Sequence, residues 1–184
     1  MFPVTIKFKA DLEDYLTHQL FIASKSPGIA RKRSRNKMVV GLLFTAAGLS
    51  FFATENIPVG SAFVTIALLW FVFYPIWEAN YFKKKMQEML LENFKTPPTN
   101  QTTITLAKDI ITVNDEHNST QIKTALVTLI VEIPRLILVR FEDGKSFLVP
   151  KNKVENLEEF ENALHELAKL LGVKYNEERT WKWK

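Results

Sequence analysis

Two stretches without a single charged residue interrupt an otherwise mixed pattern of hydrophobic and polar positions. They run from Met38 to Thr54 and from Val59 to Trp77. At about 1.5 Å per helical residue, each can cross the roughly 30 Å hydrocarbon core of a bilayer, the first only just. In a chain of 184 residues, the remaining segments are too small to bury two such helices on every side. The pattern therefore predicts two transmembrane helices, 38–54 and 59–77.

The connection between these stretches, residues 55–58, is long enough for a turn and no more. Helices joined so closely must run antiparallel, so the two spans form a transmembrane hairpin (38–77) with both outer ends on one face. Basic side chains flank those ends, and by the positive-inside rule that face is the cytoplasm. These membrane-topology residues are Arg31, Lys32, Arg33, Arg35, Lys37, Lys83, Lys84 and Lys85. We expect a multi-pass protein of the cytoplasmic membrane with both termini inside.

Within the hairpin, small residues recur at helical spacing, which favours close helix packing in lipid. The predicted packing residues are Gly41, Thr45 and Gly48 on the first helix and Ser61 and Thr65 on the second. The spans contain no ionisable group, so packing is favoured over a pore or a proton path. Aromatic residues gather towards the cytoplasmic end of the second span, as expected at a membrane interface. They are Trp70, Tyr74 and Trp77.

The segment before the hairpin, residues 1–37, combines a strand pattern with an amphipathic helix. Residues 2–9 alternate apolar and polar side chains, which is typical of a half-buried strand. Asp11 is placed to cap a helix that runs to about Ser24. A strand alone at this end needs a partner, so we expect it to pack on or near the later β-rich region.

After the hairpin, residues 78–98 predict a cytoplasmic helix that Pro97 and Pro98 end. Residues 99–172 predict six short strands and then an amphipathic helix from Val154 to Leu171, capped by Asn156. This succession predicts an α+β protein whose soluble part is a small β-sandwich or partly closed β-barrel with a helix at one end. The strands are expected at TITLA, IITVN, QIKT, TLIVEI, LILVRF and SFLVP.

The remaining segment, residues 173–184, is a basic and aromatic tail that ends in Trp181-Lys182-Trp183-Lys184. Indole rings and ammonium groups both favour the headgroup layer of a membrane. Two interpretations stay open for it, a segment lying in that layer and a disordered tail.

Charge and candidate chemistry narrow the function classes. The net charge of +4 gathers beside the apolar stretches, and no nucleic-acid-binding motif accompanies it, so we expect no nucleic-acid partner. The chain has no cysteine, which excludes thiolate catalysis and cysteine-bound metals. The three histidines, His18, His117 and His165, lack metal-binding spacing. We therefore predict no catalytic residue, no metal, no cofactor and no enzymatic activity.

Several short elements give the chain a resemblance to a known family. Glu13-Asp14-Tyr15 in the first helix, the two spans, and Val149-Pro150-Lys151 before the last helix together resemble the YcxB-like bacterial membrane proteins. The resemblance implies a bacterial inner-membrane location and a C-terminal domain of pleckstrin-homology (PH) type, but no established activity. Such domains often carry a tryptophan after the third strand, where this sequence reads Lys123-Thr124-Ala125.

Two functional hypotheses follow. The first is a membrane-tethered binding or scaffolding module that presents its β domain at the cytoplasmic face, because tethering raises the local concentration of a binding surface. The alternative is an oligomeric membrane component that transports or senses a small solute or lipid. The partners expected are the lipid bilayer and either a cytoplasmic protein or further copies of the chain.

Overall fold

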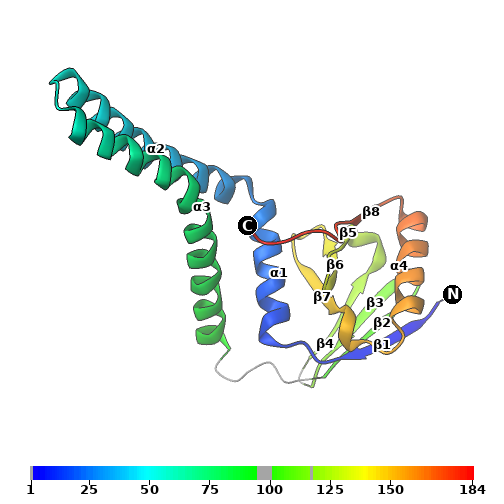
Figure 1. Ribbon diagram of the computed structural model, residues 1–184. Coiled ribbons are helices and arrows are strands. Elements are labelled where there is room, and N and C mark those ends of the chain that lie inside the picture. The colour runs from blue at the N-terminus through cyan, green and yellow to red at the C-terminus, as the bar shows by residue number, and fades with distance from the viewer. Residues whose placement is uncertain (1, 95–100, 117) are drawn as a thin grey trace. The chain divides into compact units, whose positions relative to one another are not determined.

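The computed structural model describes residues 2–94, 101–116 and 118–184 (Figure 1). The chain divides into two compact units. One unit, here called the β domain, lies within residues 1–18 and 89–182, and the other, the hairpin unit, comprises residues 19–88 and 183–184. The predicted linker prolines, Pro97 and Pro98, fall outside the described residues.

The hairpin unit is built from long helices. Helix α1 (Leu12–Lys25) begins in the β domain and is followed by α2 (Pro27–Ala53) and α3 (Ile57–Asn93). Ser26 caps α2 through its side-chain oxygen, which accepts a hydrogen bond from the Ile29 amide at 3.5 Å. Helix α2 therefore starts well before its apolar stretch and carries the basic residues 31–37 on its first turns.

Two long apolar helices joined by a short turn are thus confirmed. Glu55 adopts a positive φ of 61° in that turn. The amide of Thr54 donates to the Phe51 carbonyl, which closes the end of α2.

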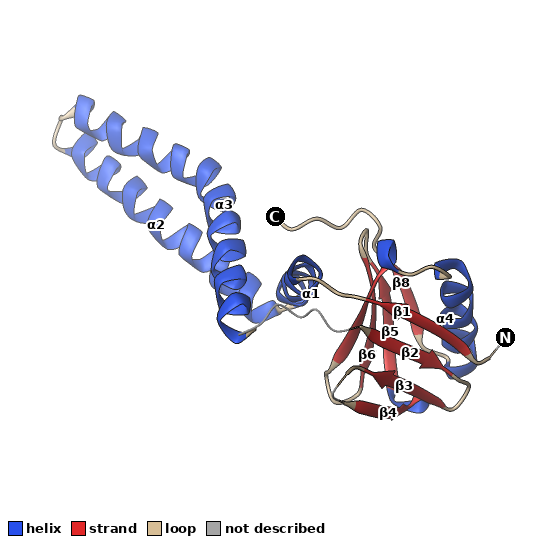
Figure 2. Cartoon of the chain, turned by 90° about the horizontal axis from the view of Figure 1, so that it is seen from below, coloured by secondary structure: helices blue, strands red, loops and turns tan. Residues whose placement is uncertain are grey.

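The β domain contains two four-stranded sheets (Figure 2). The first is an antiparallel meander of β1 (Val4–Phe8), β2 (Thr102–Leu106), β3 (Ile110–Asn114) and β4 (Ser119–Lys123). Its register pairs Val4 with Leu106 and Phe8 with Thr102. The expected pairing of the N-terminal strand with the later β region is therefore confirmed.

The second sheet has the order β7-β6-β5-β8. It consists of β5 (Val127–Glu132), β6 (Leu136–Phe141), β7 (Ser146–Pro150) and β8 (Lys174–Glu177). Short 3-10 turns, η1 (Thr124–Leu126) and η2 (Lys151–Lys153), precede β5 and follow β7. Strand β8 pairs in parallel with β5, which none of the sequence patterns indicated.

Helix α4 (Leu157–Leu171) packs against β1, β5 and β8 (Figure 2). Its apolar face supplies Phe160, Leu164 and Leu167, all completely buried. Burial of each such side chain stabilises the fold by about 1.5–3 kcal/mol relative to exposure in water. Asn156 occupies the N-cap position, but its side chain makes no capping hydrogen bond, because its backbone is not in the extended conformation that capping requires.

The α+β class is confirmed, and of the two forms expected for the β domain, a sandwich or a partly closed barrel, the barrel is not formed within the described residues. Among the described strands, neither sheet closes on itself into a barrel. The core lies where the inner faces of both sheets meet α4, and its completely buried residues include Ile104, Leu106, Ile111, Ile130, Ile137 and Val139.

Candidate functional site

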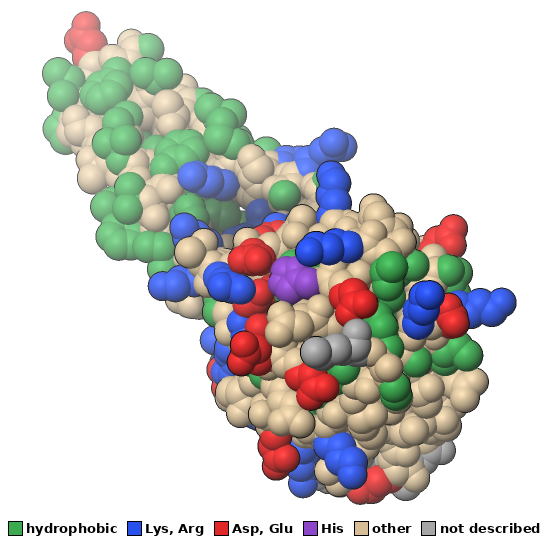
Figure 3. All heavy atoms as spheres, turned by 90° about the vertical axis from the view of Figure 1, so that its right-hand side faces the viewer, with side chains coloured by type: hydrophobic (Ala, Val, Ile, Leu, Met, Phe, Trp, Pro, Cys, Tyr) green, Lys and Arg blue, Asp and Glu red, His purple; other side chains and the backbone are tan. Residues whose placement is uncertain are grey.

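The hairpin exposes apolar side chains around its circumference. Leu43, Leu68 and Phe73 are 65 %, 62 % and 59 % exposed. In the most apolar 18-residue segment of each helix, only 11 % is buried. Figure 3 shows hydrophobic side chains gathered over this part of the molecule. Helices α2 and α3 are each long and apolar enough to cross a membrane. A helix from the core of a water-soluble protein would instead have most of these side chains buried.

Glycines bring α2 and α3 close together. A Cβ atom added to Gly41 would lie 2.2 Å from the Phe71 ring. One added to Gly48 would lie 2.8 Å from Val64 and 3.1 Å from the Gly60 carbonyl oxygen. Small residues at these positions let the helix backbones approach, as helix pairs in lipid require.

Two of the predicted packing residues are not buried between α2 and α3. Ser61 and Thr65 are exposed, and the Thr65 hydroxyl donates to the Ser61 carbonyl of its own helix at 2.8 Å. Thr45 is half-buried and likewise donates to the Gly41 carbonyl at 2.9 Å. Gly60 lies one position from Ser61 and is buried. A one-residue step rotates a helix position by about 100°, so the contact face of α3 runs through Gly60 rather than Ser61.

We expect Gly48→Val to destabilise the hairpin, because the added methyl groups would meet backbone that cannot move aside as a side chain can. Overpacking of this kind typically costs about 1–3 kcal/mol. The measurement is the SDS fraction that unfolds the full chain in mixed micelles. Gly28→Ala is the control, since the nearest atom to its added Cβ, the Ser26 hydroxyl oxygen, is 3.9 Å away. Equal unfolding midpoints for the two variants would contradict the packing.

At the basic end of the hairpin, side chains tie α2 to α3. The Trp70 indole N–H donates to the Lys37 carbonyl at 3.3 Å, and Arg33 forms an ion pair with Glu78 at 2.5 Å. Trp183 belongs to this unit: its indole N–H donates to the Ala79 carbonyl at 2.9 Å, and the Arg33 guanidinium lies 4.9 Å from its ring. The end of the tail is thus ordered on the helices. Of the other membrane-topology residues, Lys37 is half-buried. The rest are exposed: Arg31, Lys32, Arg35, Lys83, Lys84 and Lys85.

In the β domain, Asp14 is completely buried beside two cations. Its carboxylate accepts hydrogen bonds from Lys153 and, at 3.2 Å, from Arg135. Asp11 and Asp14 also cap the start of α1 reciprocally, each accepting from the other's amide at 2.9–3.0 Å. Burial acts to raise the pKa of Asp11, but hydrogen bonds from Lys153 and the Asp14 amide outweigh it and lower that pKa to about 2.

A second buried carboxylate, Glu132, lies on β5. It is 1 % exposed and pairs with Lys151 and with Arg179, whose Nε lies 2.9 Å away. Burial opposes its ionisation, but the hydrogen bonds from Lys151 and Arg179 prevail and lower the pKa of Glu132. Asp14 and Lys151, quoted above for the family resemblance, therefore both belong to ion pairs that hold the β domain together.

These ion pairs predict acid sensitivity. The pKa values of Asp11 and Glu132 are lower in the folded protein than in the unfolded chain. As the pH falls, the unfolded chain therefore binds protons first, which favours unfolding. Their contribution to stability is complete above the ordinary pKa values of 3.8 for Asp11 and 4.5 for Glu132 and is lost as the pH falls below them. For Asp11 the loss extends down to its folded pKa of about 2. Denaturant unfolding of the full chain in detergent across this range measures the effect. The Asp11→Asn/Glu132→Gln double variant should show a shallower decline, and an equal slope would contradict the assignment.

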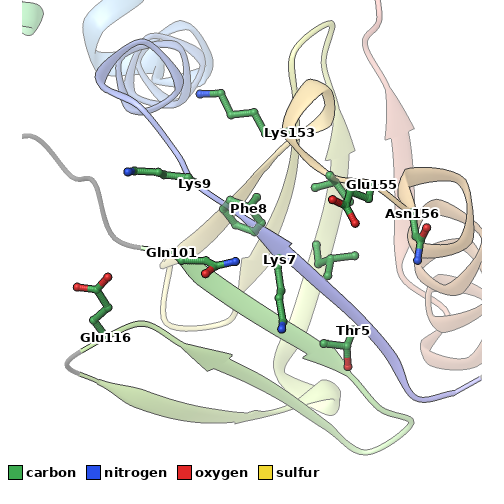
Figure 4. Close-up of a pocket in the computed structure, with 11 residues that line it drawn as sticks. Thr5, Lys7, Phe8, Lys9, Gln101, Glu116, Lys153, Glu155 and Asn156 are labelled. Atoms are coloured by element: carbon green, nitrogen blue, oxygen red, sulfur yellow. The ribbon is translucent and has the colours of Figure 1, made fainter.

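A groove of about 740 Å³ follows β1 (Figure 4). Lys7 and Lys9 line it from β1 and its end, Gln101 from the residue before β2, and Lys153 and Asn156 from the segment before α4. Lys153 forms ion pairs with Asp11 and Asp14. Among the described residues, no carboxylate lies within ion-pair distance of Lys7 or Lys9. Two carboxylates, Glu116 and Glu155, also line the groove. It therefore presents cations, carboxylates and two amide side chains, a mixed set suited to a polar ligand.

The histidines take local roles. The imidazole Nε2 of His18 lies 2.7 Å from the Ser146 hydroxyl oxygen, and burial lowers the pKa of this histidine. His165 stacks on Tyr175, and His117 falls outside the described residues. Over residues 2–94, 101–116 and 118–184, no three His, Asp or Glu side chains are grouped so as to hold a metal ion.

Comparison of the chain with models of protein families, with curated proteins and with solved structures found no match. The resemblance to the YcxB-like proteins thus stays a prediction from the sequence elements quoted above.

Proposed function

We propose that this chain is a membrane-anchored binding module. The hairpin of α2 and α3 holds it in a bacterial inner membrane, and the β domain binds a cytoplasmic partner near that surface. The observation that carries the proposal is the pairing, in one chain, of a hairpin with exposed apolar faces and a separate β domain with its own buried core. Anchoring confines the binding surface to the membrane face and raises its effective concentration there.

Charge placement supports the orientation of this proposal. The outer ends of α2 and α3 carry exposed cations, whereas the turn between the helices carries Glu55. Cytoplasmic loops are rich in Lys and Arg, so both termini lie inside the cell. The aromatic residues Trp70, Tyr74 and Trp77 mark the same end of α3, as belts at the membrane interface do.

The strand order supports a PH-like β domain. Four meandering antiparallel strands are followed by a three-stranded antiparallel meander and a C-terminal helix that packs across one end of the core. The chain departs from that plan in two respects: the hairpin is inserted between β1 and β2, and β8 is added beside β5. The groove beside β1, with Lys7 and Lys9, is the proposed binding surface.

Site-specific photocrosslinking in intact cells tests the proposal. A photoreactive amino acid replaces Lys7 in the groove and, as a matched control, Lys169, an exposed residue of α4. The proposal predicts an adduct with a different protein from position 7 and none from position 169. Adducts confined to further copies of the chain would instead support the oligomeric alternative and contradict the binding module.

A further inference from the structure

One face of α3 carries a continuous ladder of aromatic rings. Trp70 stacks on Tyr74 with ring centroids 4.5 Å apart, Tyr74 meets Trp77 at 5.9 Å, and Trp77 stacks on Tyr81 at 5.4 Å. The indole of Trp70 is fixed to the Lys37 carbonyl, so the ladder is held from one end. Because each ring restrains the next, little rotamer freedom remains to be lost on binding a ligand.

An apolar groove of about 480 Å³ runs along this ladder. It is lined by Ile66, Leu69, Trp70, Phe73, Tyr74 and Trp77. Phe73 and Trp77 are 59 % and 58 % exposed, so the groove is open to the surroundings of the helix. From Ile66 to Trp77 the helix rises roughly 16 Å, about half of a 30 Å hydrocarbon core. The groove therefore matches the depth of a single leaflet, which is the span of one acyl chain.

The same stripe ends in positive charge. Lys84 and Lys85 lie three and four residues beyond Tyr81, on the helix face that the ladder occupies. Both are exposed. They lie about 10–12 Å along the axis from Trp77. Lysine side chains that extend back towards the bilayer can reach phosphate groups from there. Glu88, one turn further, limits the positive region on that side.

From this charge complementarity we propose that the stripe is a binding site for one anionic phospholipid. An acyl chain lies along the ladder from Ile66 to Trp77, and the phosphate is held by Lys84 and Lys85. A second copy of the chain fits this face less well. Two copies inserted with the same orientation would bring Lys84 and Lys85 of each to the same depth, where like charges repel.

The test uses tryptophan quenching in the full-length chain, and it rests on the membrane anchoring proposed above. The Trp181→Phe/Trp183→Phe background leaves Trp70 and Trp77 as reporters. The protein is reconstituted into phosphatidylcholine vesicles that contain a small fraction of acyl-brominated lipid, either phosphatidylglycerol or phosphatidylcholine. At low salt the brominated anionic lipid should associate about threefold to tenfold more strongly, since each lysine near a membrane surface contributes at most roughly fivefold.

Matched substitutions locate the effect. Lys84→Gln/Lys85→Gln should abolish the preference for the anionic lipid, whereas Lys169→Gln/Lys174→Gln, which removes the same charge from the β domain, should leave it intact. Equal quenching by both brominated lipids, an undiminished preference in the Lys84/Lys85 variant, or loss of preference in the control would each overturn the site. Failure of the chain to float with the vesicles would instead refute the anchoring proposal, and flotation is measured separately.

Discussion

Replacing Leu68 and Val72 together by arginine is expected to prevent stable membrane integration of the chain. These side chains are 62 % and 61 % exposed in α3, near the middle of its apolar stretch. If lipid tails surround them, each arginine costs about 2.5–3.5 kcal/mol at the centre of a span. If water surrounded them, each change would cost no more than about 0.5 kcal/mol, as for most exposed positions. The measurement is the fraction of full-length chain that stays in membranes after alkaline extraction.

The control for this experiment places arginine at exposed apolar positions of the β domain. Leu126 and Leu170 are 41 % and 56 % exposed. Leu126→Arg/Leu170→Arg should be retained in membranes like the unsubstituted chain. Equal retention of all three proteins would contradict lipid exposure of α3, because both double variants place two arginines at exposed positions and only one of them does so in a predicted span.

Glu132→Leu is expected to open the second sheet of the β domain. It removes a carboxylate that is 1 % exposed and leaves Lys151, 21 % exposed, with Glu161 3.8 Å away as its nearest remaining partner. Breaking a buried ion pair in this way typically costs about 3–5 kcal/mol, and because Arg179 reaches water the cost here is about 2–3 kcal/mol. Hydrogen exchange of β5 and β6 amides in the full chain should then accelerate about 30-fold to 150-fold if these amides exchange by global unfolding of the domain.

Two further variants separate charge pairing from simple packing. Glu159→Gln, at an exposed position in the first turn of α4, should change the exchange by no more than about threefold. Glu132→Met/Lys151→Met should recover much of the loss, since a well-packed apolar pair can replace a buried ion pair. Exchange in Glu132→Leu within threefold of the unsubstituted chain would show that this pairing contributes little to stability.

The sequence predicted the elements that depend on local pattern. The uncharged stretches predicted α2 and α3, and the alternation of residues 2–9 predicted β1, because burial of one face leaves its period in the sequence. Short β-rich segments bounded by turn residues predicted β2 to β7. The partner of β1 was predicted from the need of a lone strand for hydrogen bonds. Its apolar positions Val4, Ile6 and Phe8 are indeed buried in the sheet with β2.

Strand β8 was missed because its sequence carries no strand signal. Lys174-Tyr175-Asn176-Glu177 lacks apolar alternation and is mostly exposed. Its position comes from backbone pairing with β5 and from Tyr175, which stacks on His165. Strands β5 and β8 are far apart in the sequence, and the stacking of His165 on Tyr175 depends on the chain turning back after α4. No local sequence pattern therefore predicts either contact.

The candidate sites were accessible to sequence reasoning in different degrees. Small-residue spacing pointed to glycines on α2, but it could not fix the rotation of α3, where Gly60 and not Ser61 faces the partner helix. The pairs that bury Asp14 and Glu132 join residues separated by 19 to 139 positions, so a single sequence gives no signal for them. The aromatic ladder was visible in part, as Trp70, Tyr74 and Trp77, and the structure extends it to Tyr81.

The most direct test of the account is the accessibility of single cysteines in intact cells, which the cysteine-free chain allows without further changes. With a membrane-impermeant maleimide, Glu55→Cys in the turn should be labelled from outside, and Lys169→Cys only after the membrane is broken. Leu69→Cys, in the second span, should resist labelling until the protein is denatured. Ready labelling of Leu69→Cys in the native protein, or labelling of Lys169→Cys from outside the cell, would contradict a hairpin that lies in lipid with its β domain in the cytoplasm.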